Sequence, residues 1–266
     1  MLQNIVTLLF FCACFAYVGL MGYAYFMADK LIFPDIPASY SDGPNIIKLN
    51  AADGESISSY FLEAPNSKAL LLYCHGNGED LGHIREFIEQ FRKAGISVFA
   101  FNYPGYGTSS GKTSEHGCYA ASDAAYNYVT QKLGYAPAQI CLYGRSLGGG
   151  PSCWLAQRYP VGSMILDGTF TSTFRVMTQR KLIPWDKFDN LARLPNIHCP
   201  ILFIHGTQDL TVPFSHAMTN YKAYQGPKQK FWIEGAGHND LYEVAGEAYH
   251  STVFQFIDNH HQRHFE

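Results

Sequence analysis

The polarity of the chain changes sharply after its first 28 residues. Residues 2–28 contain no charged side chain and are dominated by Leu, Phe, Ile, Val, Cys and Ala. A helix of about 20 such residues can cross a bilayer. The pattern therefore predicts a transmembrane anchor at residues 1–28, with Tyr17, Tyr23, Tyr25 and Phe26 forming an interfacial belt near its C-terminal end.

A cleavable signal peptide is the alternative interpretation of this segment. Such a peptide needs a basic N-terminal region, which is missing, and its apolar stretch is only roughly 7 to 15 residues long. A retained anchor is therefore favoured. Lys30 beside Asp29 is the only nearby basic residue, so the orientation in the membrane stays open. Cys12 and Cys14 lie in mid-segment, which favours packing over palmitoylation.

Residues 29–45 are rich in proline, glycine and serine and predict a linker. Two short apolar segments then follow, at residues 46–49 and 57–62, on either side of Asp53-Gly54. Apolar segments separated by such a turn are typical of an antiparallel hairpin.

From residue 69 onward, strand and helix patterns alternate. The continuous apolar run at 69–74 is typical of a strand buried on both faces. Similar runs predict strands at 96–101, 139–143, 163–166, 201–205 and 230–234. Helical patterns are found at about 80–94, 115–133, 146–159, 215–224 and 240–259. Strict alternation predicts a mostly parallel sheet with helices on both faces, within one α/β domain at residues 46–266.

Composition narrows the choice of function. The 266 residues are 47% hydrophobic and 15% charged, which is enough apolar content for a large core. The net charge of −3, without a long Lys/Arg run, gives no reason to expect nucleic acid as a partner. Five cysteines follow the anchor without a CxxC pair, so buried free thiols are expected, and no metal or other cofactor.

The most informative motif is Gly144-Arg145-Ser146-Leu147-Gly148, which directly follows the apolar residues 140–143. This is the G-x-S-x-G nucleophile elbow, a sharp strand-to-helix turn that exposes a serine. The same pattern also occurs in ordinary glycine-rich turns, so residues elsewhere in the chain must decide whether Ser146 is a nucleophile. A serine hydroxyl is a weak nucleophile and needs a histidine base held by a carboxylate.

Both partners occur downstream of Ser146. Asp209 follows the predicted strand 201–205, and His238 follows the predicted strand 230–234. Carboxyl ends of parallel strands share one edge of the sheet, and the order serine, acid, histidine is the one found with this elbow. The sequence therefore predicts Ser146, Asp209 and His238 as a catalytic triad. Asp167 is the competing acid.

Backbone donors for an oxyanion are expected in two places. One is Leu147, which follows the nucleophile at the start of a helix. The other is Asn77 in the loop His75-Gly76-Asn77-Gly78 after the strand 69–74. We expect His75 to pack and form hydrogen bonds rather than to act as a second base.

A short insertion between the predicted strands 163–166 and 201–205 indicates a small cap at about residues 170–199. Its apolar side chains are compatible with an acyl pocket and also with simple packing against the sheet. These residues are Phe170, Phe174, Met177, Leu182, Ile183, Pro184 and Trp185.

Together these motifs resemble the α/β-hydrolase superfamily and, within it, the Bem46-like branch with its ABHD13- and ABHD17-type serine hydrolases. The resemblance covers most of residues 46–257 and implies an α/β-hydrolase fold preceded by one transmembrane helix. It implies Ser146 as nucleophile, Asp209 as acid, His238 as base, and Asn77 with Leu147 as oxyanion hole. Further matching segments are Asn102-Tyr103-Pro104-Gly105-Tyr106-Gly107, Gly206-Thr207-Gln208-Asp209 and Gly237-His238-Asn239-Asp240.

The resemblance also implies hydrolysis of an ester, thioester or amide, since some relatives remove palmitate from protein cysteines. The cysteine-rich N-terminal cluster of those relatives is absent here. We therefore predict a membrane-anchored serine hydrolase of acyl esters or thioesters, acting on a small-molecule or lipid-acylated substrate. An amidase or peptidase of the same fold and a catalytically silent binding protein are the alternatives. Acyl chain length and oligomeric state are left open.

Overall fold

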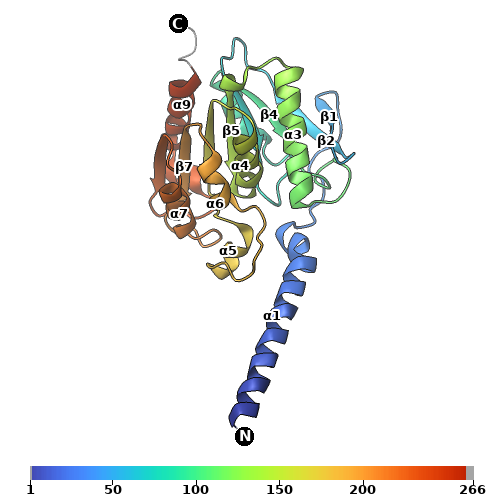
Figure 1. Cartoon of the computed structure of the whole chain (residues 1–266). Helices are drawn as coiled ribbons and strands as arrows, with labels where there is room; N and C mark the ends of the chain where they lie inside the picture. Colours follow the sequence, from blue (N-terminus) through green and yellow to red (C-terminus); the bar gives the residue numbers. More distant parts are fainter. Residues whose placement is uncertain (1, 262–266) are drawn as a thin grey trace.

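A long helix leads into an α/β domain in which helices flank a twisted sheet (Figure 1). The computed structural model describes residues 2–261. Residue 1 of the predicted anchor and residues 262–266 of the predicted hydrolase domain lie outside the described residues.

The N-terminal helix α1 (Leu2–Ile32) is longer than the predicted anchor and continues through the first residues of the predicted linker. Asp29 and Lys30 are compatible with a helix, and the N–H of Phe33 still donates to the carbonyl of Asp29 at 2.9 Å. Pro34 then disfavours a helical conformation for the residue before it. By length and composition α1 can span a membrane, and its most apolar stretch is entirely exposed in the isolated chain.

The sheet has eight strands in the order β1-β2-β4-β3-β5-β6-β7-β8. The hairpin β1–β2 is antiparallel and β2 pairs with β4 antiparallel, whereas all other pairs are parallel. The predicted hairpin and mostly parallel sheet are therefore confirmed. The strands are β1 (Ile46–Asn50), β2 (Ser56–Leu62), β3 (Leu70–Cys74), β4 (Ser97–Phe101), β5 (Ile140–Arg145), β6 (Ser163–Asp167), β7 (Ile201–Gly206) and β8 (Lys228–Ile233).

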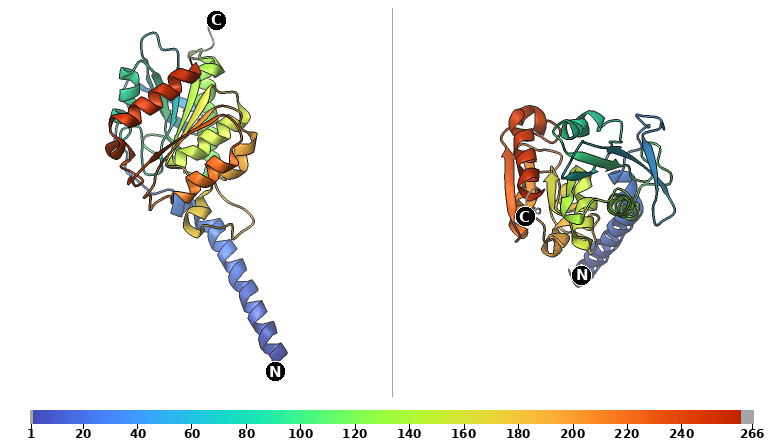
Figure 2. Two further views of the ribbon diagram at one scale, coloured as in Figure 1. Left: turned by 90° about the vertical axis from the view of Figure 1, so that its left-hand side faces the viewer. Right: turned by 90° about the horizontal axis from the view of Figure 1, so that it is seen from above.

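Helices cover both faces of the sheet (Figure 2). Successive side chains of a strand point to opposite faces, so the side chains of a buried strand pack against both layers of helices. In β3, Leu70 and Leu72 pack in one hydrophobic cluster and Leu71 and Tyr73 in another. The first cluster includes residues of α3 (Glu115–Gln131) and α4 (Gly149–Arg158), and the second includes residues of α2 (Arg85–Lys93) and α9 (Glu247–His261). Strands β3, β4 and β7 are buried at every position.

Two predicted helices differ from the observed ones. The helix predicted from residue 80 begins only at Arg85, because the Asp80 carboxylate accepts backbone N–H groups of Gly82 and His83 and holds this segment as a turn. The helix predicted at 240–259 is two helices, α8 (Leu241–Ala245) and α9. Gly246 separates them with a φ of +56°, which a helix does not contain.

The segment between β6 and β7 contains the short helices α5 (Thr173–Thr178) and α6 (Asn190–Arg193) and corresponds to the predicted cap. Helix α5 lies beside the C-terminal part of α1 in two views (Figures 1 and 2). Helix α7 (Ser215–Ala223) follows β7.

The cysteines fall into two groups. The five that follow α1 are buried and free, as expected. Cys12 and Cys14 are exposed, and the expected packing against other residues of the chain is not seen. The N-terminal part of α1 projects away from the domain (Figure 1).

Candidate active site

Ser146 occupies the turn between the central strand β5 and helix α4. It begins a 3-10 turn, Ser146–Gly148, and its φ is +51°. Residues other than glycine rarely adopt this left-handed conformation, so the surrounding structure must hold Ser146 in it. The residue is 9% exposed. The strained turn therefore presents the serine at the carboxyl edge of the sheet while keeping most of its surface away from solvent.

The two glycines of the elbow allow close backbone contacts. A Cβ atom at Gly144 would lie 2.7 Å from the Cα of Gly149, and one at Gly148 would lie 1.9 Å from the carbonyl oxygen of Cys74. Both distances are far below van der Waals contact. Any larger residue would therefore push the elbow away from β3 and from the start of α4.

His238 connects Ser146 with Asp209. Its Nε2 lies 3.0 Å from the Oγ of Ser146, and its Nδ1 lies 2.7 Å from Oδ2 of Asp209. A carboxylate only accepts hydrogen bonds, so Nδ1 donates to Asp209 and Nε2 is left to accept from the serine hydroxyl. The three residues predicted from the sequence are thus brought into one hydrogen-bonded row.

Asp209 is held by its own loop after β7. Its Oδ1 accepts the backbone N–H groups of Thr211 and Val212 at 2.9 and 2.7 Å, and His205 Nε2 lies 3.2 Å from its Oδ2. Burial alone would raise the pKa of Asp209. The hydrogen bonds from His205 and His238 outweigh it, and the pKa is lowered well below its usual value. Asp209 therefore stays negatively charged and is held in place facing His238.

Asp167, the competing acid, has other partners. Its Oδ2 accepts the hydroxyl groups of Tyr143 and Tyr249, each at 2.8 Å, and lies 3.8 Å from Nε of Arg145. Within residues 2–261, the contacts of this carboxylate do not include His238. The structure therefore brings Asp209, and not Asp167, to the histidine.

Arg145 links Asp167 to the histidine loop. Its Nη2 donates to the carbonyl of His238 and to Oδ1 of Asn239, the latter at 3.2 Å. Burial alone would lower the pKa of this guanidinium, but the negative charge of Asp167 outweighs burial and raises it. This link could not be predicted from sequence patterns, because Arg145, Asp167 and Tyr249 are far apart along the chain.

The two residues expected to form an oxyanion hole lie on either side of Ser146. Leu147 follows the serine at the start of the 3-10 turn. The Nδ2 of Asn77 donates to the carbonyl of Ile32 at 2.8 Å, so its side chain is directed toward the end of α1. The N–H of Gly76 is occupied by Oε2 of Glu79 at 2.8 Å. The backbone N–H groups of Asn77 and Leu147 therefore stay our prediction for the donors.

His75 is fully buried at the start of the same loop. Its Nδ1 lies 2.7 Å from the carbonyl of Gly76, and its ring packs against Tyr103 with 4.3 Å between centroids. Burial lowers its pKa, which keeps the ring neutral. These contacts agree with the expected packing role.

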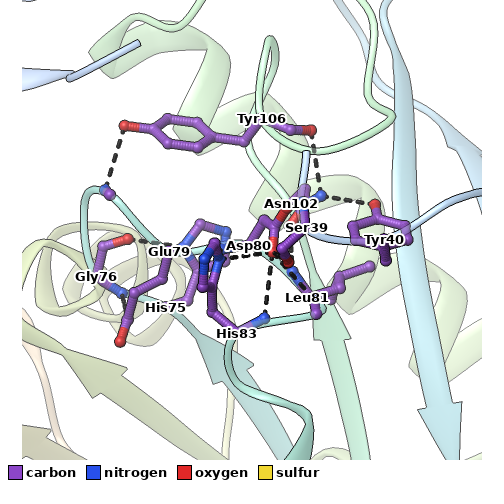
Figure 3. Close-up of polar contacts among 12 residues, drawn as sticks. Ser39, Tyr40, His75, Gly76, Glu79, Asp80, Leu81, His83, Asn102 and Tyr106 are labelled. Atoms are coloured by element: carbon purple, nitrogen blue, oxygen red, sulfur yellow. Dashed lines mark hydrogen bonds and ion pairs between the residues drawn. The ribbon is translucent and has the colours of Figure 1, made fainter. Parts of the chain in front are cut away.

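A network of polar contacts connects this loop to the segment after α1 (Figure 3). The Asp80 carboxylate accepts the backbone N–H of Ser39 at 2.7 Å and also its hydroxyl group. Nearby, Nδ2 of Asn102 donates to the Tyr40 hydroxyl at 2.8 Å, while its Oδ1 accepts the N–H of Leu81 at 3.1 Å. The predicted linker is therefore bound to the loop beside Ser146.

A cavity of about 500 Å³ lies next to Ser146 and is lined mainly by apolar side chains. Asn77, Ser146 and Leu147 form its floor. Its other walls come from the cap, from α1 and from Thr211 and Val212 in the loop after β7. Six of the seven apolar cap residues named from the sequence line it, namely Phe170, Phe174, Met177, Leu182, Ile183 and Trp185, whereas Pro184 does not. The volume lies in the range of small-ligand sites.

Comparisons with known proteins agree with this architecture. Residues 69–193 match a family model described as the alpha/beta hydrolase fold. The proteins named alpha/beta hydrolase domain-containing protein 17B of Xenopus tropicalis and Homo sapiens are each 38% identical to the chain over 208 residues, covering 77% of this chain and 72% of the relative.

Among solved structures, the esterase Pf2001 of Pyrococcus furiosus superposes with a TM-score of 0.73 at 16% identity. The match covers 86% of this chain and 98% of the esterase. At this identity the likeness concerns the fold.

Proposed function

The chain belongs to the α/β-hydrolase family, with the proteins named alpha/beta hydrolase domain-containing protein 17 among its relatives, and on this premise we propose that it is a serine hydrolase of acyl esters or thioesters. Ser146 is the nucleophile, His238 the base and Asp209 the acid. The observation that carries the proposal is the row of contacts from Ser146 Oγ to His238 Nε2 at 3.0 Å and from His238 Nδ1 to Asp209 at 2.7 Å.

The reaction proceeds through an acyl-enzyme. Ser146 Oγ attacks the acyl carbonyl carbon while its proton passes to Nε2 of His238. The charge of Asp209 stabilises the imidazolium that forms. The negative oxygen of the tetrahedral intermediate is bound by the backbone N–H groups of Leu147 and Asn77. When the intermediate collapses, the bond to the alcohol or thiol breaks and His238 returns the proton to the leaving group.

Water completes the cycle. It attacks the carbonyl of the acyl-Ser146, His238 takes its proton, and the carboxylic acid leaves while the proton returns to Ser146 Oγ. The cavity beside Ser146 is mainly apolar, which suits an acyl chain. An ester or thioester is favoured over an amide because an alcohol or thiol is a better leaving group than an amine.

We further propose that α1 anchors the enzyme in a membrane. The helix is 31 residues long, and its residues 2–28 carry no charge. Its side chains from Leu2 to Phe15 are largely exposed in the isolated chain, which in water would leave a long apolar surface uncovered. A bilayer would cover it.

The proposal is tested with a fluorophosphonate probe and a short p-nitrophenyl ester. We expect the probe to label the full-length protein and to fail with Ser146→Ala, which should also lose ester turnover. Ser152→Ala is the matched control, since this buried serine lies on α4 away from His238. Labelling of Ser146→Ala, or full turnover by it, would contradict the assignment.

A second set of substrates separates the chemical classes. The same acyl group is presented as an oxygen ester, a thioester and an amide, and kcat/KM is compared. Preference for the amide would support the amidase alternative. A folded protein that neither binds the probe nor hydrolyses any of the three would support a silent binding protein.

A further inference from the structure

One face of α1 forms a wall of the cavity beside Ser146. Leu20, Ala24, Ala28 and Ile32 all line this cavity, and their spacing of four residues places them in one row along the helix. Ala28 is only 2% exposed, whereas the nearby Phe26 is 80% exposed. The C-terminal part of α1 therefore has one face turned to the site and another turned outward.

Specific contacts hold α1 in this position. Asp29 forms an ion pair with Lys187 at 2.5 Å. The hydroxyl of Tyr17 donates to the carbonyl of Leu182 in the cap at 3.0 Å. At its end, the carbonyl of Ile32 accepts from Asn77, which lies beside Ser146. Contacts thus exist near both ends of the lining row, with the cap and with the loop of the site.

The length of α1 allows it both to span a membrane and to line the cavity. Its 31 residues extend about 46 Å at 1.5 Å per residue, whereas a bilayer core is about 30 Å thick and needs about 20 residues. About ten residues are left over. The row of lining residues begins at Leu20, so most of it falls within the excess at the C-terminal end.

The opposite wall of the cavity is also apolar and reaches the same end of the domain. Met177 and Leu182 in the cap line the cavity, yet they are 86% and 50% exposed. Helix α5 lies beside α1 where α1 leaves the domain (Figure 1). The mouth of the cavity therefore carries apolar side chains on both sides at the level where α1 would enter the membrane, and the cap side also carries the basic residues Arg180 and Lys181.

We propose that residues 20–32 of α1 form the wall that receives the acyl chain of the substrate. The anchor is then a specificity-determining part of the site, and a long acyl chain passes from the adjoining leaflet along α1 to Ser146. The substrate class is a long-chain fatty acyl ester or thioester embedded in the membrane. This inference rests on the proposed serine-hydrolase function.

The row of α1 residues that line the cavity predicts how the length of the substrate's acyl chain is selected. Ala24 and Ala28 are small, so they leave space between α1 and the cap. A bulky side chain at position 24, which is half-buried, would fill this space with little disturbance of the domain core. A long acyl chain needs the space more than a short one does.

The test compares Ala24→Trp with the full-length parent in detergent micelles. We measure kcat/KM for p-nitrophenyl palmitate and p-nitrophenyl butyrate and expect the ratio of palmitate to butyrate to fall at least tenfold. Ala13→Trp is the matched control, because Ala13 is exposed on α1 about three turns before Ala24 and does not line the cavity. We expect its ratio to stay within twofold of the parent.

The outcomes separate this inference from the proposed function. An unchanged ratio in Ala24→Trp, with the parent active on butyrate, would overturn the role of α1 alone. A parent inactive on butyrate and not labelled by a fluorophosphonate would instead refute the serine-hydrolase proposal. If Ala24→Trp does not unfold cooperatively, Ala24→Leu replaces it, and a ratio that falls less than threefold would also overturn the role.

Discussion

Asp209 follows β7 and Asp167 is the last residue of β6. Both therefore lie at the carboxyl ends of the strands, as Ser146 does, but their partners differ. Asp209 faces two histidines, and Asp167 faces two tyrosine hydroxyls and Arg145. At the sequence level both positions are compatible with a catalytic acid, because strand order places each near the elbow. Only the side-chain contacts distinguish them.

Exchange of each aspartate for asparagine should separate the two roles. In Asp209→Asn the amide can donate to Nδ1 of His238, which would favour the wrong tautomer, and we expect kcat to fall on the order of 10⁴-fold. In Asp167→Asn we expect a lower unfolding temperature and a much smaller loss of kcat, since Arg145 loses a partner but His238 keeps Asp209. Steady-state kinetics with a short ester and thermal unfolding measure both effects. A larger kcat loss in Asp167→Asn would contradict the assignment.

The low pKa of Asp209 also predicts how stability depends on pH. An unfolded aspartate has a pKa of about 3.9, and folding lowers it here, so the folded state binds fewer protons. This contribution is fully present above about pH 4 and is lost as the pH falls toward the lower folded value. We expect the urea midpoint of the parent to drop between about pH 6 and about pH 3, and Asp209→Asn to drop less. Equal drops would show that Asp209 does not contribute.

At the scale of elements, local patterns predicted the sheet well because its strands are buried on both faces. Leu70–Cys74 and residues 98–101 are continuous apolar runs, and this signal requires no knowledge of distant residues. The predicted and observed elements differ where contacts of a side chain, including contacts with residues distant in the chain, determine the local conformation. The helix predicted from residue 80 begins only at Arg85, and the Asp80 carboxylate that holds the turn before it also binds Ser39, which is 41 positions away along the chain.

The contact between Asp80 and Ser39 should stabilise the segment after α1 against the loop that holds Asn77. Asp80→Asn removes a buried charge that accepts four hydrogen bonds, and such bonds to a charged group contribute about 1.5–3 kcal/mol each. We expect a clearly lower unfolding temperature and faster proteolysis within residues 34–45. Asp53→Asn, in the exposed turn of the β1–β2 hairpin, is the control and should change neither. Unchanged proteolysis in Asp80→Asn would argue against the link.

At the scale of the whole molecule, the sequence predicted an anchor, a linker and a hydrolase domain as successive units. The observed contacts cross these boundaries: Asp29 pairs with Lys187 of the cap, Phe33 packs against Phe188 at 6.1 Å between ring centroids, and Ser39 binds Asp80. Pattern analysis cannot reveal such contacts, because hydropathy shows that α1 is apolar but not which surface it meets. The proximity of Ser146, His238 and Asp209 was predictable from strand ends, whereas the part of α1 in the cavity wall was not.

Membrane anchoring can be tested on the full chain by charge substitution within α1. Two arginines near the centre of the part of α1 that would span the membrane, Leu9→Arg with Phe10→Arg, should each cost about 2.5–3.5 kcal/mol of insertion free energy. We therefore expect the parent to stay in the membrane pellet after alkaline carbonate extraction and this variant to move largely to the supernatant. Gln3→Arg with Asn4→Arg adds the same charge at the helix end, where long side chains reach the interface, and should stay in the pellet. If all three proteins are extracted alike, α1 does not span the membrane, and the cavity that it lines with the cap must obtain its acyl chains from solution instead.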